Sequence, residues 1–118
     1  MIKYLNNPLT INYMFPKLFG LPVKTATHRD QEQLSRVFSA LGESGRLRIF
    51  TMLAYSEGMC VTEIAYALNS SLPAVSYHLK ILEIAGLVKK ERMGQEICYE
   101  IKKNKPLVRR IVRIIQST

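Results

Sequence analysis

Apolar residues recur at the spacing of one helix face from about residue 30 onward. The positions at i, i+3, i+4 and i+7 of this face are Leu34, Val37, Phe38 and Leu41. Gly42 follows directly, and glycine is the residue type that most often lies just past a helix end. The pattern therefore predicts an amphipathic helix over residues 30–41.

Three further helices are expected before residue 86, because a capping residue precedes each apolar stretch. Ser44 is placed to cap one helix, and Thr62 is placed to cap a second, short one. After a tight turn, Ser71 is placed to cap a third helix with Pro73 in its first turn, where backbone N–H groups lack helical partners. Two helices joined by such a turn predict a helix-turn-helix.

The period of the pattern changes after residue 86. Ile97, Tyr99 and Ile101 alternate with more polar positions, which is the period of a half-buried strand. A preceding strand and a glycine-containing turn complete a β-hairpin. A short apolar run at residues 59–61 is expected to add a single β-bridge.

The last apolar stripe occupies one face of residues 106–117, while arginines occupy another face. Asn104 is placed to cap this helix. The complete order is helix, helix, short helix, helix, hairpin, helix. This order predicts a mainly α fold with a small β-hairpin, of the α+β class, in the form of a winged helix-turn-helix.

Residues 1–29 differ from the rest of the chain. Pro8, Pro16 and Pro22 interrupt any helix there, so we expect an irregular N-terminal arm. Residues 30–118 are expected to form one domain for DNA binding and dimerisation. Whether the arm packs on its own domain or on a partner subunit stays open at this point.

The net charge of the chain indicates the kind of partner that it binds. The 118 residues include 17 Lys and Arg but only 9 Asp and Glu, which gives a net charge of +8. The excess lies in residues 1–29 and 89–118, whereas the middle of the chain has mixed charge. Two basic blocks favour a surface that faces a polyanion, and an α-helix fits the major groove of double-stranded DNA.

The second helix of the predicted helix-turn-helix carries small and polar groups on its outer face, and the adjacent hairpin carries basic ones. The candidate DNA-binding residues are Ser71, Ala74, Ser76, Tyr77, His78 and Lys80 on the helix, and Lys89, Lys90, Arg92 and Gln95 on the hairpin. Arg46 and Arg48 are further candidates for phosphate contacts, although one of them could instead pair with Glu43.

Five segments, in order along the chain, carry a resemblance to a known family. They are Ala40–Ile49, Val61–Ala65, Val75–Leu82, Ala85–Val88 and Arg92–Tyr99. Together they resemble the ArsR/SmtB family of winged helix-turn-helix repressors. The resemblance implies a homodimer that binds an inverted-repeat operator and represses transcription, with a dimer interface built from the first and last helices. The implied dimerisation residues are Leu34, Val37, Phe38, Leu107, Val108, Ile111 and Ile115.

Metal-sensing members of that family place thiols in a Cys-Val-Cys pattern, or Asp and His on the last helix. This chain has Cys60, Val61 and Thr62 at the first position, and residues 106–117 contain neither Asp nor His. The N-terminal arm adds only His28. Because zinc and soft metals need several N, S or O ligands, we predict no metal site and no cofactor.

The two cysteines, Cys60 and Cys98, are candidate sensing residues. Cys60 has three interpretations: a small buried hydrophobic residue, a thiol sensor or a metal ligand. If residues 59–61 pair with the hairpin strand, Cys60 and Cys98 approach each other. This topology motivates the hypothesis of a redox pair.

The leading hypothesis is a dimeric, sequence-specific DNA-binding repressor whose effector, a small molecule or a redox signal, is unknown. The alternatives are a thiol- or metal(loid)-responsive repressor that uses Cys60, and a winged-helix module that docks a protein partner. An enzyme is not expected, because no carboxylate pair, phosphate loop or nucleophile–base pair stands out. No stretch is long and apolar enough to span a bilayer, so the predicted location is the cytoplasm, where thiols stay reduced.

Overall fold

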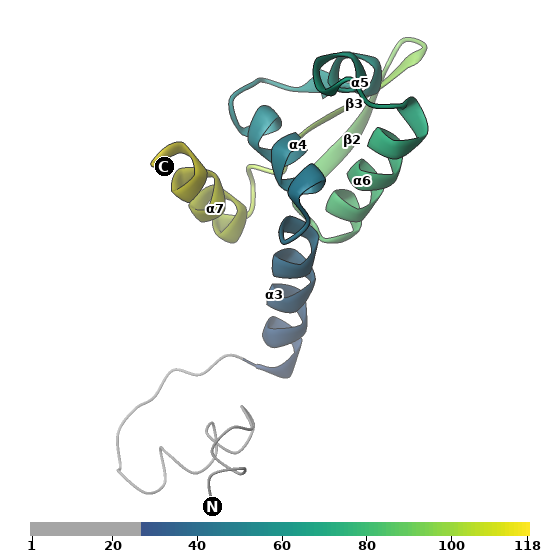
Figure 1. The fold of residues 1–118 in the computed structure, drawn as a ribbon. Helices are drawn as coiled ribbons and strands as arrows, with labels where there is room; N and C mark the ends of the chain where they lie inside the picture. The colour runs from purple at the N-terminus through teal and green to yellow at the C-terminus, as the bar shows by residue number, and fades with distance from the viewer. Residues whose placement is uncertain (1–26) are drawn as a thin grey trace, which may run out of the picture. The chain divides into compact units, whose positions relative to one another are not determined.

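The computed structural model describes residues 27–118, so most of the predicted N-terminal arm lies outside the described residues. Elements are labelled as in Figure 1. They are α3 (His28–Leu41), α4 (Ser44–Ala54), β1 (Met59–Cys60), α5 (Val61–Leu68), α6 (Leu72–Ile84), β2 (Val88–Met93), β3 (Glu96–Ile101) and α7 (Pro106–Gln116). The predicted mainly α fold with a small sheet is confirmed.

The described residues divide into two units, 27–35 and 36–118. In the first unit, α3 begins at His28, two residues before the expected start. The Asp30 carboxylate accepts hydrogen bonds from the Thr27 backbone N–H and hydroxyl, at 3.0 and 2.8 Å, which closes the first turn. The second unit contains the end of α3 and all the other elements.

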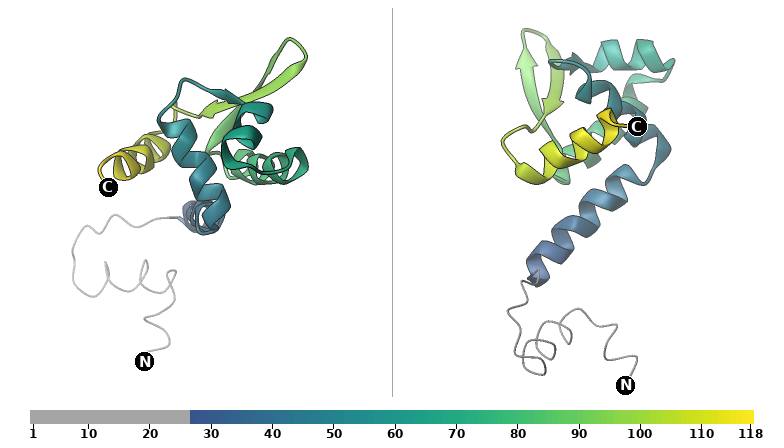
Figure 2. Two further views of the ribbon diagram at one scale, coloured as in Figure 1. Left: turned by 45° about the horizontal axis from the view of Figure 1, so that its top comes forward. Right: turned by 90° about the vertical axis from the view of Figure 1, so that its left-hand side faces the viewer.

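The sheet of the second unit has three antiparallel strands in the order β1-β3-β2. Strand β1 is only two residues long and pairs Met59 with Tyr99 and Cys60 with Cys98. The expected hairpin consists of β2 and β3, and its tip extends beyond the helices (Figure 2). The short apolar run at residues 59–61 therefore joins the sheet, as its sequence predicted.

The core of the second unit lies where α4, α5 and α6 meet one face of the sheet. Its largest fully buried side chains include Phe50 from α4, Ile64 from α5, and Leu79 and Leu82 from α6. No polar side chain is buried within the described part of the chain. Hydrophobic burial therefore holds the inner face of α6 against the sheet.

Three helix caps differ from the predicted residues. Glu43, rather than Ser44, caps α4, because its carboxylate reaches the backbone N–H of Arg46 at 2.9 Å. Cys60, rather than Thr62, precedes α5, and the Glu63 carboxylate accepts the Cys60 N–H at 2.9 Å. Each carboxylate takes a capping role that the sequence analysis assigned to a hydroxyl.

The third difference lies at α7, where Lys105 rather than Asn104 is the N-cap residue, without a side-chain hydrogen bond. The cap of α6 was predicted correctly, since the Ser71 hydroxyl accepts the Ala74 N–H at 3.2 Å. Asn69 adopts a left-handed conformation (φ 50°), which ends α5 and turns the chain toward α6.

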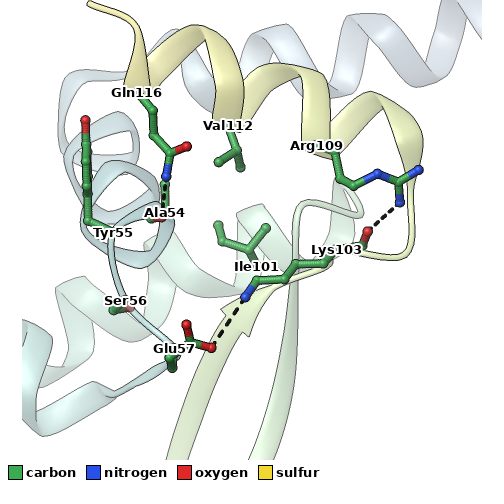
Figure 3. A pocket seen from close by; sticks show the side chains of 9 residues that line it. All are labelled: Ala54, Tyr55, Ser56, Glu57, Ile101, Lys103, Arg109, Val112 and Gln116. Carbon is green, nitrogen blue, oxygen red and sulfur yellow. Dashed lines mark hydrogen bonds and ion pairs between the residues drawn. The ribbon is translucent and has the colours of Figure 1, made fainter.

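Helix α7 is tied to the rest of its unit by polar bonds around a hollow of about 520 Å³ (Figure 3). The Gln116 side-chain amide donates to the carbonyl of Ala54 at 3.0 Å. At the other end, Arg109 donates to the carbonyl of Lys103 at 2.6 Å, and Lys103 Nζ lies 3.6 Å from Glu57 Oε2. These bonds use the polar groups of the hollow to hold α7 beside α4 and the end of β3.

Replacing Leu79 by alanine is expected to destabilise the fold by about 2–5 kcal/mol, because it opens a cavity in the core beneath α6. The matched change Tyr66→Ala, at a residue 91% exposed, is expected to stay within about 0.5 kcal/mol. Urea unfolding followed by circular dichroism measures both. Equal effects of the two changes would contradict the assigned core.

Candidate nucleic-acid interface

Helices α5 and α6 and the turn between them position the predicted recognition surface. The inner stripe of α6, formed by Val75, Leu79 and Leu82, is buried against α4, α5 and the sheet. This burial turns the opposite face of α6 to solvent. The exposed residues of the predicted set on α6 are Ser71, Ala74, Ser76, Tyr77 and Lys80.

The hairpin has two faces of opposite character, because successive side chains of a strand point to opposite sides. Lys90 pairs with Tyr99 and Arg92 pairs with Ile97, so these residues share the face on which the helices lie. Lys89 pairs with Glu100 on the other face, where Glu91 also lies. Adjacent lysines of the wing therefore belong to different surfaces.

A groove between α6 and the hairpin brings four of the predicted residues together. Ser76 and Lys80 line it from α6, and Lys90 and Gln95 line it from the hairpin, around a hollow of about 420 Å³. Lys90 makes it suited to a negatively charged backbone, whereas Lys80 Nζ lies 3.5 Å from Glu83 Oε1 and Glu96 also lines the groove. The groove also includes Thr62, which sequence reasoning did not select as a contact because only tertiary packing brings α5 beside the hairpin.

Other predicted residues have partners of their own outside this groove. Lys89 Nζ lies 2.8 Å from Glu100 Oε1, and this hydrogen bond and ion pair raise the pKa of Lys89. The Arg92 side chain donates to the carbonyl of Gly94 at 3.3 Å. Tyr77 is 63% exposed, and its ring lies against the ring of His78.

His78 lies at the joint between α6 and the start of α4. Its Nδ1 is 3.8 Å from the Glu43 carboxylate and 3.5 Å from an Arg46 guanidinium nitrogen. Arg46 also donates to the carbonyl of Ala40 at 2.7 Å, so it connects elements of the protein. Arg48 stays exposed beside this joint. The structure thus gives His78 and Arg46 positioning contacts and leaves Arg48 open.

The Glu43 carboxylate is electrostatically favoured in its charged form. Backbone hydrogen bonds from Arg46 and Gly45, and then the nearby His78 and Arg46 charges, lower the pKa of Glu43 below its usual value. The same carboxylate caps α4 and faces α6 through His78. Its ionisation therefore bears on how the recognition helix is held.

Cys60 lies on the edge strand β1 at the start of α5, and Cys98 lies opposite it on the central strand β3. Cys60 and Cys98 are joined in a disulfide, with their Cα atoms 3.7 Å apart. Among residues 27–118 no group of three or more His, Cys, Asp or Glu side chains is arranged to hold a metal ion.

The predicted dimerisation residues divide into two groups. Val37, Val108 and Ile111 are buried in the core of their own unit. Leu34, Leu107 and Ile115 are half-buried, and Phe38 is 65% exposed. Ile114, which the sequence analysis did not select, is exposed on α7. The helical stripe alone did not separate the inner side chains from the outer ones.

Comparison with known proteins identifies the family. The family of bacterial regulatory proteins called arsR matches residues 43–90. An uncharacterised HTH-type transcriptional regulator of Methanocaldococcus jannaschii is 34% identical over 86 residues, which cover 73% of this chain and 94% of that protein. The chain belongs to the ArsR family. It is accordingly a DNA-binding transcriptional regulator and not an enzyme.

Two further relatives support the assignment of this protein to the ArsR family. A transcriptional repressor SmtB homologue of Synechocystis is 40% identical over 73 residues, which cover 62% of this chain and 54% of the relative. The homodimeric winged helix-turn-helix domain of Mb0332 from Mycobacterium bovis is 30% identical, with a TM-score of 0.66 over 80% of this chain and 88% of that one. The predicted resemblance to the ArsR/SmtB family is therefore confirmed.

The joint at Glu43 predicts a pH dependence of stability. A carboxyl whose pKa is lowered by folding adds stability above its unfolded pKa, and this stability is lost as the pH falls through the folded pKa. We expect Glu43→Gln to lower the melting temperature at pH 7. At a pH below the usual pKa range of carboxyl groups, the melting temperatures of the variant and the wild type are expected to differ little.

The matched control is Glu91→Gln on the exposed hairpin, which removes a carboxylate that caps no helix. Thermal unfolding at pH 7, 5 and 3 provides the measurement. A Glu43→Gln effect that is the same at every pH would show that the ionised carboxylate has no special role in the joint.

Proposed function

We propose that this ArsR-family protein is a homodimeric transcriptional repressor that binds an inverted-repeat operator in the cytoplasm. The groove in which Ser76 and Lys80 of α6 face Lys90 and Gln95 of the hairpin carries this proposal. It supplies small polar groups and cations side by side on the two elements that a winged helix-turn-helix presents to DNA. The SmtB homologue of Synechocystis, a repressor by name, supports the direction of regulation.

Within this proposal, the exposed face of α6 enters the major groove of the operator. Ala74, Ser76 and Tyr77 approach the base edges there, because they lie in the first half of the helix. Lys80, Lys90 and the other basic side chains approach phosphates, which set position and affinity rather than sequence preference. Lys89 contributes less, because it is paired with Glu100 on the opposite face of the hairpin.

Dimerisation is supported by the apolar surface that the second unit leaves exposed. Phe38 and Ile114 are 65% and 63% exposed, which is unusual for such large apolar side chains. The homodimeric Mb0332 domain is a relative in which two copies associate. A dimer places two recognition helices on one duplex, and its two-fold symmetry matches an inverted repeat.

The two neighbouring lysines of the wing provide a matched test of DNA binding. We expect Lys90→Ala to weaken binding to the protein's own promoter DNA and to reduce the salt slope of the affinity by about one. Lys89→Ala is expected to change both much less, because Lys89 faces away from the groove. Fluorescence anisotropy across a salt series measures both variants.

Ser76→Ala tests sequence readout in the same assay. It is expected to reduce the preference for operator over random DNA while leaving the salt slope unchanged, because a serine carries no charge. If Ser76→Ala, Lys80→Ala and Lys90→Ala all leave DNA binding unaltered, the groove is not the DNA surface. A module that docks a protein partner would then be the better account.

Oligomeric state tests the second part of the proposal. Phe38→Glu and Ile114→Glu are each expected to shift the protein from dimer toward monomer, because a carboxylate cannot be buried in an apolar interface without a partner. Tyr66→Glu, at an exposed residue of α5, is the control and is expected to leave the dimer intact. Sedimentation velocity distinguishes these results, and a monomeric wild type would contradict the proposal.

A further inference from the structure

We infer that Cys60 and Cys98 form a reversible dithiol–disulfide site that neutral peroxides oxidise, and that its state sets the mobility of the wing relative to the recognition helix. The expected effect on operator affinity rests on the proposed function. The existence of the oxidation site is independent of that proposal.

The backbone places the two cysteines for this reaction. Cys60 is the last residue of β1 and the N-cap of α5, and Cys98 lies directly opposite it on the central strand β3. Cysteines whose Cα atoms are more than about 7 Å apart cannot be bridged without backbone movement. Here the Cα atoms are 3.7 Å apart and the sulfurs are bonded. The register of β1 and β3 therefore brings the two cysteines together.

The disulfide joins two elements that otherwise share few bonds. Strand β1 is two residues long, and the hydroxyl of Thr62 donates to the Glu96 carboxylate at 3.1 Å close by. Because α5 is packed against α6, a covalent link from α5 to β3 also restrains the hairpin relative to α6. The groove lined by Ser76 and Lys90 lies between these elements, so the link limits changes in its width.

The surroundings of the pair select the oxidant. Cys60 and Cys98 line a hollow of about 350 Å³, together with the carboxylates of Glu57, Glu91, Glu96 and Glu100. Lys103 and Lys89 are paired with two of these carboxylates, those of Glu57 and Glu100. The charge of the other two opposes the approach of anionic thiols and disulfides, such as those of glutathione, and does not oppose hydrogen peroxide. The Cys98 side of the strand is opposite the face that carries Lys90, so the hollow stays reachable while DNA occupies the groove.

The reaction balances with peroxide as the oxidant. Cys60 is half-buried and Cys98 is 8% exposed, so the Cys60 sulfur attacks first. It takes one peroxide oxygen to form a sulfenic acid and releases water. The Cys98 sulfur then displaces that oxygen as a second water and forms the S–S bond. Two thiols lose two electrons and two protons in total, and a dithiol reductant returns them.

The test starts with the full chain, fully reduced and then treated with hydrogen peroxide or with oxidised glutathione. Peroxide is expected to remove two hydrogens from the mass, and a dithiol reductant is expected to restore them. Hydrogen exchange of the amides in β1 and β3 is expected to slow by roughly fivefold or more on oxidation, because the cross-link suppresses local opening. Cys98→Ser, with Cys60→Ser as the companion variant, is expected to show neither change while keeping its circular dichroism spectrum.

Promoter binding, measured for the reduced and oxidised protein, separates the two proposals. An affinity difference of about threefold or more that is absent in Cys98→Ser supports the inference. Reversible oxidation with slowed exchange, in a protein that binds no DNA in either state, overturns the proposed function and leaves the site intact. Normal DNA binding with no internal disulfide after peroxide, or a glutathione adduct in its place, overturns the inference.

Discussion

Strand β3 pairs with β1 on one side and with β2 on the other, and the candidate DNA surface depends on this double pairing. Through β1 the strand reaches the start of α5, and through β2 it supports the cations of the wing. The two halves of the groove are thus attached to one backbone element. A shift of β3 by a single residue would exchange the faces of the hairpin and move Lys90 out of the groove.

Apolar burial supplies the other constraint on the interface. The inner stripe of α6 packs into the core. On the outer face, the structural contacts are the Ser71 cap and the contact of His78 with Glu43. This division explains how the recognition surface can contain small residues such as Ala74 and Ser76 without loss of stability. Sequence preference can change on such a face while the helix stays in place.

Much of this fold follows from local patterns. The stripe that includes Val75, Leu79 and Leu82, the Ser71 cap and the two-residue alternation of Ile97, Tyr99 and Ile101 predicted α6 and the hairpin, and the structure has both. Resemblance to the family added the expectation of a dimer. Helix caps were predicted less well, because a glutamate side chain reaches backbone groups that composition rules assign to serine or threonine.

The candidate site was harder to predict where tertiary packing decides. Sequence places Lys89 and Lys90 together, and only the strand register separates them. An apolar stripe at helical spacing likewise marks Val108 and Ile111 without stating that their own core covers them. Thr62 reaches the groove through the contact between α5 and β3, which no local pattern records.

The two faces of the hairpin give the wing an internal polarity. One side carries Lys90 and Arg92, and the other carries Glu91 and Glu100. In the proposed DNA complex, an approaching duplex would be attracted to the first side more than to the second, where Lys89 is already paired with Glu100. The acidic side would then help to orient the protein during association without touching DNA.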